Sequence, residues 1–177
     1  FATEPTEIGP TEPLEENPPK GKTFVWMECE LPQCGMLSDG FRAATAALGW
    51  NYEAITYQVA DPSSLVAGLK QALKLNPAGV SVGALPQEVW QSVVPDYAAA
   101  NVPIIPVGIG KATLDETVIG NVLTWDDFAK FGAVNANWFI ADSNGAGHAL
   151  IVNVPAYGIL QAFTEGATAE IEKNCPG

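Results

Sequence analysis

The sequence predicts an α/β protein with a doubly wound parallel sheet, and three observations carry this prediction. The chain has 177 residues, of which 47% are apolar and 16% charged, and at this length about 70% of the unfolded surface is buried on folding. From residue 23 onward, short apolar runs rich in β-branched and aromatic residues alternate with amphipathic segments. Glycine, proline and aspartate stand at the boundaries, and this alternation is typical of βα units with parallel strands.

The first half of the pattern contains four strands and three helices. We expect strands at 23–29, 52–59, 78–82 and 102–107, and helices at 37–48, from 62 onward, and at 86–100. Gly49 closes the first helix as its C-cap, and Asp61 with Pro62 supplies an N-cap and a proline at the first helical position of the second. Because crossovers between parallel strands are right-handed, we predict a sheet of order 2-1-3-4 over residues 23–110.

Two further strands and two helices are predicted after a glycine-rich crossing, GIGKATLDE. We expect a strand at 118–123, a helix at 125–141, a strand at 148–154 and a helix at 157–172. Residues 111–177 therefore form a βαβα unit, which completes six strands and five helices. If this unit is only part of a larger one, the strands at 118 and 148 leave an unpaired sheet edge. Such edges recruit partners, so we then expect a homo-oligomer of the fragment.

The charge of the chain excludes two classes of partner. Eight basic and 20 acidic residues give a formal net charge of −12, which is the wrong sign for binding nucleic acid or an anionic membrane surface. No apolar run approaches the roughly 20 residues that span a bilayer. Glutamate and proline crowd residues 1–22, and we interpret this segment as an extended, acidic, Pro-rich tether or as a disordered chain end.

The order of these signals resembles a type I periplasmic binding protein, the sugar-type substrate-binding protein of ABC importers. The similar stretches are KTFVWM, LSDGFRAATAALGW, ADPSSLVAGLKQAL, AGVSVGALPQEVWQSVVPDYAAANVPIIPV and HALIVNVPAYGILQAFTEG. The resemblance implies two lobes, with residues 23–110 forming most of lobe one and residues 111–177 the beginning of lobe two. The chain then looks like a fragment of such a receptor. Its ligand is expected in a cleft at the carboxyl ends of the strands.

The function implied by the resemblance is that of an extracytoplasmic solute receptor. Such a receptor binds a small polar ligand, here sugar-like, and presents it to an ABC permease in the membrane; it is not an enzyme and needs no cofactor. The acidic N-terminus resembles the tether of a secreted lipoprotein, so we expect a periplasmic or membrane-tethered location. Sugar receptors commonly carry Asn-Pro and aromatics after the first strand. Here the stretch is Leu31-Pro32-Gln33-Cys34, which disfavours a simple hexose.

Polar side chains near the carboxyl ends of the predicted strands are the candidate ligand contacts. Carboxylates and amides form bidentate hydrogen bonds with vicinal hydroxyls or with a cationic ligand. The carboxyl ends of parallel strands meet at one edge of the sheet, where open α/β sheets bind their ligands. The candidates are Glu28, Glu30, Gln33, Gln87, Asp126 and Asn153. The alternative interpretation of each is a solvated surface side chain.

Cys29 and Cys34 lie five residues apart across a tight loop. We predict a disulfide between them, as expected for an exported protein. The alternative is that Cys34, just ahead of a helix, is a nucleophile, which would make the chain a small flavodoxin-like α/β enzyme. A third hypothesis is the ligand-sensing domain of a regulator, although no helix-turn-helix precedes Thr23.

Overall fold

The computed structural model describes residues 12, 13, 15–154 and 156–175. More than half of the predicted tether, residues 1–11 and 14, lies outside the described residues. The described chain contains one five-stranded sheet in the order β2-β1-β3-β4-β5, and every strand pair is parallel. The predicted order of the first four strands, 2-1-3-4, is therefore confirmed.

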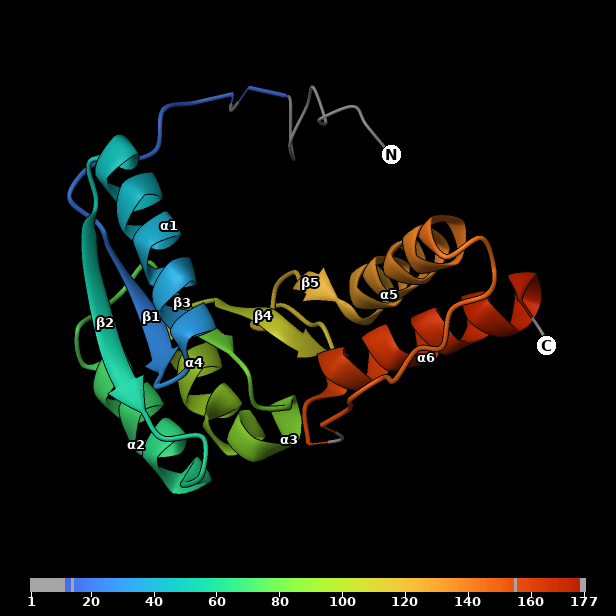
Figure 1. Ribbon diagram of the computed structural model, residues 1–177. Helices are drawn as coiled ribbons and strands as arrows, with labels where there is room; N and C mark the ends of the chain where they lie inside the picture. The colour runs from blue at the N-terminus through green and yellow to red at the C-terminus, as the bar shows by residue number, and fades with distance from the viewer. Residues whose placement is uncertain (1–11, 14, 155, 176–177) are drawn as a thin grey trace.

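Figure 1 shows the helices and strands, coloured by their order along the chain. Their bounds are β1 (Thr23–Cys29), α1 (Pro32–Leu48), β2 (Asn51–Tyr57), α2 (Pro62–Leu73), β3 (Gly79–Gly83), α3 (Gln87–Trp90), a 3-10 turn (Gln91–Val93), α4 (Val94–Ala100), β4 (Ile104–Gly110), β5 (Val122–Thr124), α5 (Trp125–Asp142) and α6 (Gly158–Asn174). Helix α1 covers one face of the sheet and helices α2, α3 and α4 cover the other (Figure 1). Helices α5 and α6 lie side by side, run in the same direction and extend away from the β4–β5 edge of the sheet (Figure 1).

Local signals explain how the first helices begin and end. Gly49 adopts the left-handed conformation with a φ of 69° at the C-cap of α1, where its N–H donates to the carbonyl oxygen of Ala46, and glycine alone is free of a Cβ penalty there. The Asp61 side chain accepts a hydrogen bond from the Ser63 backbone N–H and caps α2. Both signals are as predicted from the sequence.

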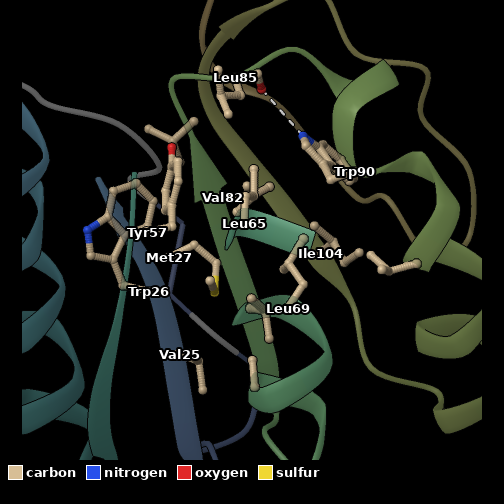
Figure 2. Packing of buried hydrophobic residues seen from close by; sticks show 14 of the residues in the cluster. Val25, Trp26, Met27, Tyr57, Leu65, Leu69, Val82, Leu85, Trp90 and Ile104 are labelled. Carbon is tan, nitrogen blue, oxygen red and sulfur yellow. Dashed lines mark hydrogen bonds between the residues drawn. The ribbon is translucent and has the colours of Figure 1, made fainter. Parts of the chain in front are cut away.

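The core lies between the sheet and its two helical layers. Figure 2 shows the tightly packed side chains of β1, α2 and β3, among which Trp26, Met27 and Leu65 have no exposed surface. Buried polar atoms in this core are paired: the Tyr57 hydroxyl donates to the Gly83 carbonyl oxygen at 2.7 Å. The Trp90 indole N–H donates to the Leu85 carbonyl oxygen at 3.4 Å (Figure 2). Pairing removes the cost of burying these groups.

The long helix predicted over 86–100 is wrong in one respect. The segment is divided into α3, a 3-10 turn and α4, and Pro95 stands in the first turn of α4. Proline has no N–H to donate, and its ring clashes with the carbonyl four residues earlier. A single helix through Pro95 is therefore disfavoured, whereas a new helix that starts just before it is not.

The two strands predicted in the second half differ most from the structure. Instead of a strand over 118–123, Val118 makes an isolated bridge with Ile104 and β5 covers only Val122–Thr124. The strand predicted over 148–154 is wrong, because these residues have no regular secondary structure. Their backbone groups up to 153 pair with no other described residue. A β-strand needs a hydrogen-bonded neighbour, and the described sheet ends at β5, which pairs with β4.

Helices α5 and α6 pack closely through small residues. A Cβ on Gly132 would collide with the Phe163 carbonyl, and one on Gly166 would collide with the Ala129 carbonyl. The two helix backbones therefore approach one another directly at these glycines. Thr124 caps α5 in a capping box with Asp127, whose carboxylate accepts from the Thr124 N–H at 2.8 Å.

Candidate functional site

A cavity of about 540 Å³ opens at the carboxyl ends of β1, β3 and β4, between the beginning of α1 and the beginning of α6. A volume of this size lies within the range of small-molecule sites. The lining residues come from β1, α1, the β3 and β4 ends, β5, α5 and the entry to α6: Trp26, Cys29, Leu31, Gln33, Cys34, Met36, Leu37, Gly83, Ala84, Val107, Gly108, Leu123, Phe128, Tyr157, Ile159 and Leu160.

The predicted disulfide forms one wall of this cavity. Cys29 ends β1, Cys34 lies in the first turn of α1, and the two are bonded with their Cα atoms 5.5 Å apart. The Cys34 carbonyl oxygen accepts a hydrogen bond from the Trp26 indole N–H at 3.2 Å. The loop that leads from the strand into the helix is thus tied to the sheet at two points. Because Cys34 is in the disulfide, it has no free thiolate to serve as a nucleophile.

The opposite wall depends on close approach of backbone to backbone. Gly108 and Gly110 at the end of β4 have φ values of 65° and 83°, a conformation that side-chain-bearing residues rarely adopt. A Cβ on Gly110 would contact Gly158 at 3.5 Å and the Trp125 ring at 3.6 Å. These glycines bring the first turn of α6 onto the sheet edge, where Tyr157 and Leu160 reach the cavity.

The two predicted carboxylates at the end of β1 lie outside the lining and bond within the chain. The Glu28 carboxylate accepts from the Ser38 hydroxyl at 2.6 Å, and the Ser38 and Tyr52 hydroxyl oxygens are also 2.6 Å apart. The Glu30 carboxylate accepts from the Val59 backbone N–H at 3.0 and 3.1 Å. Both glutamates thus connect β1 or its following loop to neighbouring elements.

Gln87 and Asp126 also lie outside the cavity lining. The Gln87 side chain is buried and clamps the loop after β4: its amide donates to the Thr113 carbonyl at 3.3 Å, and its carbonyl oxygen accepts from the Thr113 N–H at 2.7 Å. Asp126 is exposed in the first turn of α5, where a carboxylate is favoured by the helix dipole. Each side chain therefore has a structural partner or role in this conformation.

Gln33 is the predicted contact that the structure places in the cavity wall. Asn153 lies outside the lining, and its side-chain oxygen is buried without a hydrogen-bond partner among the described residues. Tyr157, which follows the same Pro155 turn, does line the cavity. The six predicted residues are therefore not brought together in one cluster, and their role in ligand binding stays a prediction.

Sequence reasoning missed the apolar side chains of the cavity. Leu37 and Met36 project from α1, Phe128 from α5, and Leu160 from α6. In the sequence these residues are ordinary members of amphipathic helices, and no motif separates them from core positions. Met36 is 75% exposed and Leu160 is 37% exposed, so both remain accessible to a ligand.

Two tyrosines near the site, Tyr52 and Tyr57, have raised pKa values. Burial raises the pKa of Tyr57 far above its usual range, and burial together with the nearby Glu28 charge outweighs the Ser38 hydrogen bond and raises the pKa of Tyr52. Both phenols stay neutral at physiological pH. Among the described residues, no group of three or more His, Cys, Asp or Glu side chains is arranged to hold a metal ion. Within the same residues, no helix is both long and apolar enough to cross a bilayer.

Comparison with known sequences returned no match, since neither a protein-family model nor a curated protein is similar to this chain. The fold, in contrast, matches solved structures. The sugar-binding protein of a sugar ABC transporter from Bacillus halodurans has a TM-score of 0.73 and 21% identity, over 88% of this chain and 53% of that one.

Two further solved structures show the same similarity. GanP, a glucose-galactose binding protein from Geobacillus stearothermophilus, has a TM-score of 0.69 and 18% identity, over 88% of this chain and 55% of that one. An ABC transporter solute binding protein from Clostridium phytofermentans with bound β-D-glucose has a TM-score of 0.68 and 11% identity, over 85% of this chain and 48% of that one.

At these identities the similarity establishes the fold. The α/β sheet is that of the sugar-type periplasmic binding proteins, which confirms the fold class that the sequence predicted. This chain spans about half the length of the solved structures that it matches.

Proposed function

We propose that this chain carries a solute-binding site of a receptor that serves an ABC importer. The observation that supports this most is the position of the cavity, at the carboxyl ends of β1, β3 and β4. The chain passes from β1 to β2 on one side and from β2 back to β3 on the other, so β1 and β3 flank the topological switch point. Open α/β sheets bind their ligands there.

The proposed ligand is a small solute that is bound and released unchanged. The cavity walls come from two parts of the chain that meet across the end of the sheet, residues 26–37 and 83–108 on one side and residues 123–160 on the other. Closing two such walls over a solute excludes water and strengthens each hydrogen bond to it. With Cys34 bridged to Cys29, the alternative of a thiol enzyme loses its nucleophile.

The proposal also includes an extracytoplasmic location for the protein and a membrane permease as its partner. A disulfide persists in oxidising compartments, so the Cys29–Cys34 bond favours an extracytoplasmic site of action. A permease in the membrane would receive the solute, as the names of the similar structures suggest. The division into two lobes at residues 110 and 111, and the lipoprotein tether, remain part of this proposal.

A screen of small solutes on the chain tests the proposal. We expect a sugar, polyol, purine or amine to raise the midpoint of thermal unfolding, with affinity then measured by calorimetry and the solute recovered unchanged by mass spectrometry. Gln33→Ala should weaken binding by about 1 kcal/mol, because it removes a hydrogen bond at the cavity wall. Gln71→Ala, on the exposed face of α2, is the matched control. Chemical conversion of the solute would contradict the proposal.

A further inference from the structure

The cavity described above has a chemistry that polar-solute binding alone does not explain. Of the sixteen residues that line it, Gln33 and Tyr157 carry a polar side-chain group with no hydrogen bond to another described residue. The Trp26 indole N–H is already donated to the Cys34 carbonyl. No charged side chain belongs to the lining among the described residues.

One lining carbonyl and the two nearby carboxylates are already hydrogen-bonded within the chain. The Gly83 carbonyl, at the end of β3, accepts from the Tyr57 hydroxyl at 2.7 Å. Glu28 and Glu30 hold Ser38 and the Val59 N–H and lie outside the lining. A hexose buried here would find free side-chain partners at Gln33 and Tyr157 alone among the described lining residues, and buried hydroxyls that stay unpaired oppose binding.

The apolar walls, in contrast, face one another from both sides. Leu37 and Met36 come from α1, and Phe128 and Leu160 come from α5 and α6. Apolar surface of a ligand that enters between these walls leaves water, and this transfer favours binding in proportion to the area buried. Gln33 is exposed and Tyr157 is half-buried, so the polar groups stand where solvent reaches the cavity.

We propose that the solute carries a neutral apolar body about the size of a six-membered ring, seated between Leu37 and Leu160, with a small polar end at Gln33 and Tyr157. This inference rests on the proposed function and names its substrate class. Aromatic and cyclic aliphatic groups attached to a sugar, an amide or an amino acid all belong to this class.

Three matched pairs of probes test the inference, because the members of each pair differ only in the apolar group. The pairs are phenyl and methyl β-D-glucopyranoside, L-phenylalanine and L-alanine, and benzamide and acetamide. Each is titrated into the 177-residue chain by calorimetry. We expect the phenyl member of at least one pair to bind about tenfold or more tightly than its partner, since the extra ring leaves water in the cavity.

Variants locate the binding. Met36→Gln and Leu160→Gln change exposed side chains of the lining, so the fold should be retained, and each should remove most of the advantage of the phenyl member. Leu75→Gln is the control, because Leu75 is similarly exposed at 44% but lies outside the lining. Circular dichroism of each variant checks that it is folded.

The outcomes separate this inference from the receptor proposal. If the methyl members bind as tightly as the phenyl members, the apolar body is wrong while the receptor function stands. If the phenyl preference is unchanged in both lining variants, or no phenyl member binds, the inference is overturned. If no probe and no solute of the broader screen binds, the receptor function is overturned as well.

Discussion

Residues 23–110 and residues 111–175 of this chain are built from the same kinds of element but are buried very differently. In the first region, Trp26, Trp90 and Tyr97 have no exposed surface. In the second, the buried side chains are mainly those of small residues such as Ala136 and Ala162, together with Val118. Large apolar side chains lie at its surface: Phe131, Val134, Trp138, Leu150, Val152 and Val154 are all at least 43% exposed.

The difference shows that a sheet covered by helices on both faces buries large apolar side chains, whereas a pair of helices alone buries few of them. In the first region the sheet presents two apolar faces, and each face is covered by helices (Figure 1). In the second region α5 and α6 contact each other through glycines, and glycine contacts bury little apolar area. The cavity lies where the two regions meet, so one wall stands on a rigid core and the other on a helix pair with less support. The expected homo-oligomer would cover the exposed side chains, and it stays a prediction.

The largest expected difference comes from matched tryptophans. Trp26→Ala should lower the free energy of unfolding by about 3–5 kcal/mol, because a fully buried side chain leaves a cavity. Trp138→Ala should change it by less than about 1 kcal/mol, since Trp138 is 55% exposed. Urea unfolding of the two variants measures both values. Equal costs would mean that Trp138 is buried in solution and that the two regions do not differ as described.

Substitution of one glycine in each region, Gly132 in α5 and Gly40 in α1, compares the packing of their helices. Gly132→Ala should destabilise the α5–α6 contact by about 1–3 kcal/mol, because the new methyl group meets the Phe163 carbonyl. Gly40→Ala in α1 has nothing within 4 Å of the added Cβ and should instead stabilise by about 0.5–1 kcal/mol through helix propensity. Hydrogen exchange of α6 amides would report the first effect. Unchanged protection in Gly132→Ala would show that the helices are not in close contact.

The disulfide provides a smaller effect on the first side of the cavity. Replacing both Cys29 and Cys34 by alanine should cost about 2 kcal/mol, because the bond closes a short loop in the unfolded chain. Thermal unfolding measures the change. Peptide mapping without reductant should find the two residues linked, and recovery of both as free thiols from the oxidised protein would refute the bond.

The capping box of α5 predicts the smallest effect, and it depends on pH. Hydrogen bonds from Thr124 lower the pKa of Asp127 below its unfolded value of about 3.9. The stabilisation is therefore present above that value and is lost as the pH falls through the folded pKa. The difference in unfolding free energy between the chain and its Asp127→Asn variant should be greatest near neutral pH and should shrink in acid. A difference that is independent of pH would contradict the cap.

The sequence predicted the secondary structure correctly where local signals determine it and where strands pair in a sheet covered on both faces. Gly49, Asp61 and the apolar run of β1 led to the right elements, and the spacing of Cys29 and Cys34 led to the right bond. The segment 148–154 was not predictable, because its apolar run ALIV indicates only a propensity for strand. A strand also requires a hydrogen-bonded neighbour. Its sequence contains no signal of whether one is present.

The candidate site was predictable in position but less so in chemistry. The rule for parallel sheets led to the carboxyl ends of the strands, where the cavity lies. Glu28, Glu30 and Gln87 were chosen for their polarity, yet each has a hydrogen-bonded partner within the chain. Which polar side chain is already paired depends on tertiary contacts that a single sequence does not display. Leu160 illustrates the converse, since an apolar helix residue became part of the lining through the approach of α6 to β4.

Mapping of backbone amide chemical shifts on the isotope-labelled chain tests most directly whether the cavity is the binding site. On titration with the tightest-binding probe of the matched pairs, we expect the largest shifts at residues 31–37, 83–84, 107–108 and 157–160, which line the cavity from both regions. Shifts confined to one region, or centred on α2 or on residues 139–151, would place binding elsewhere and contradict the account.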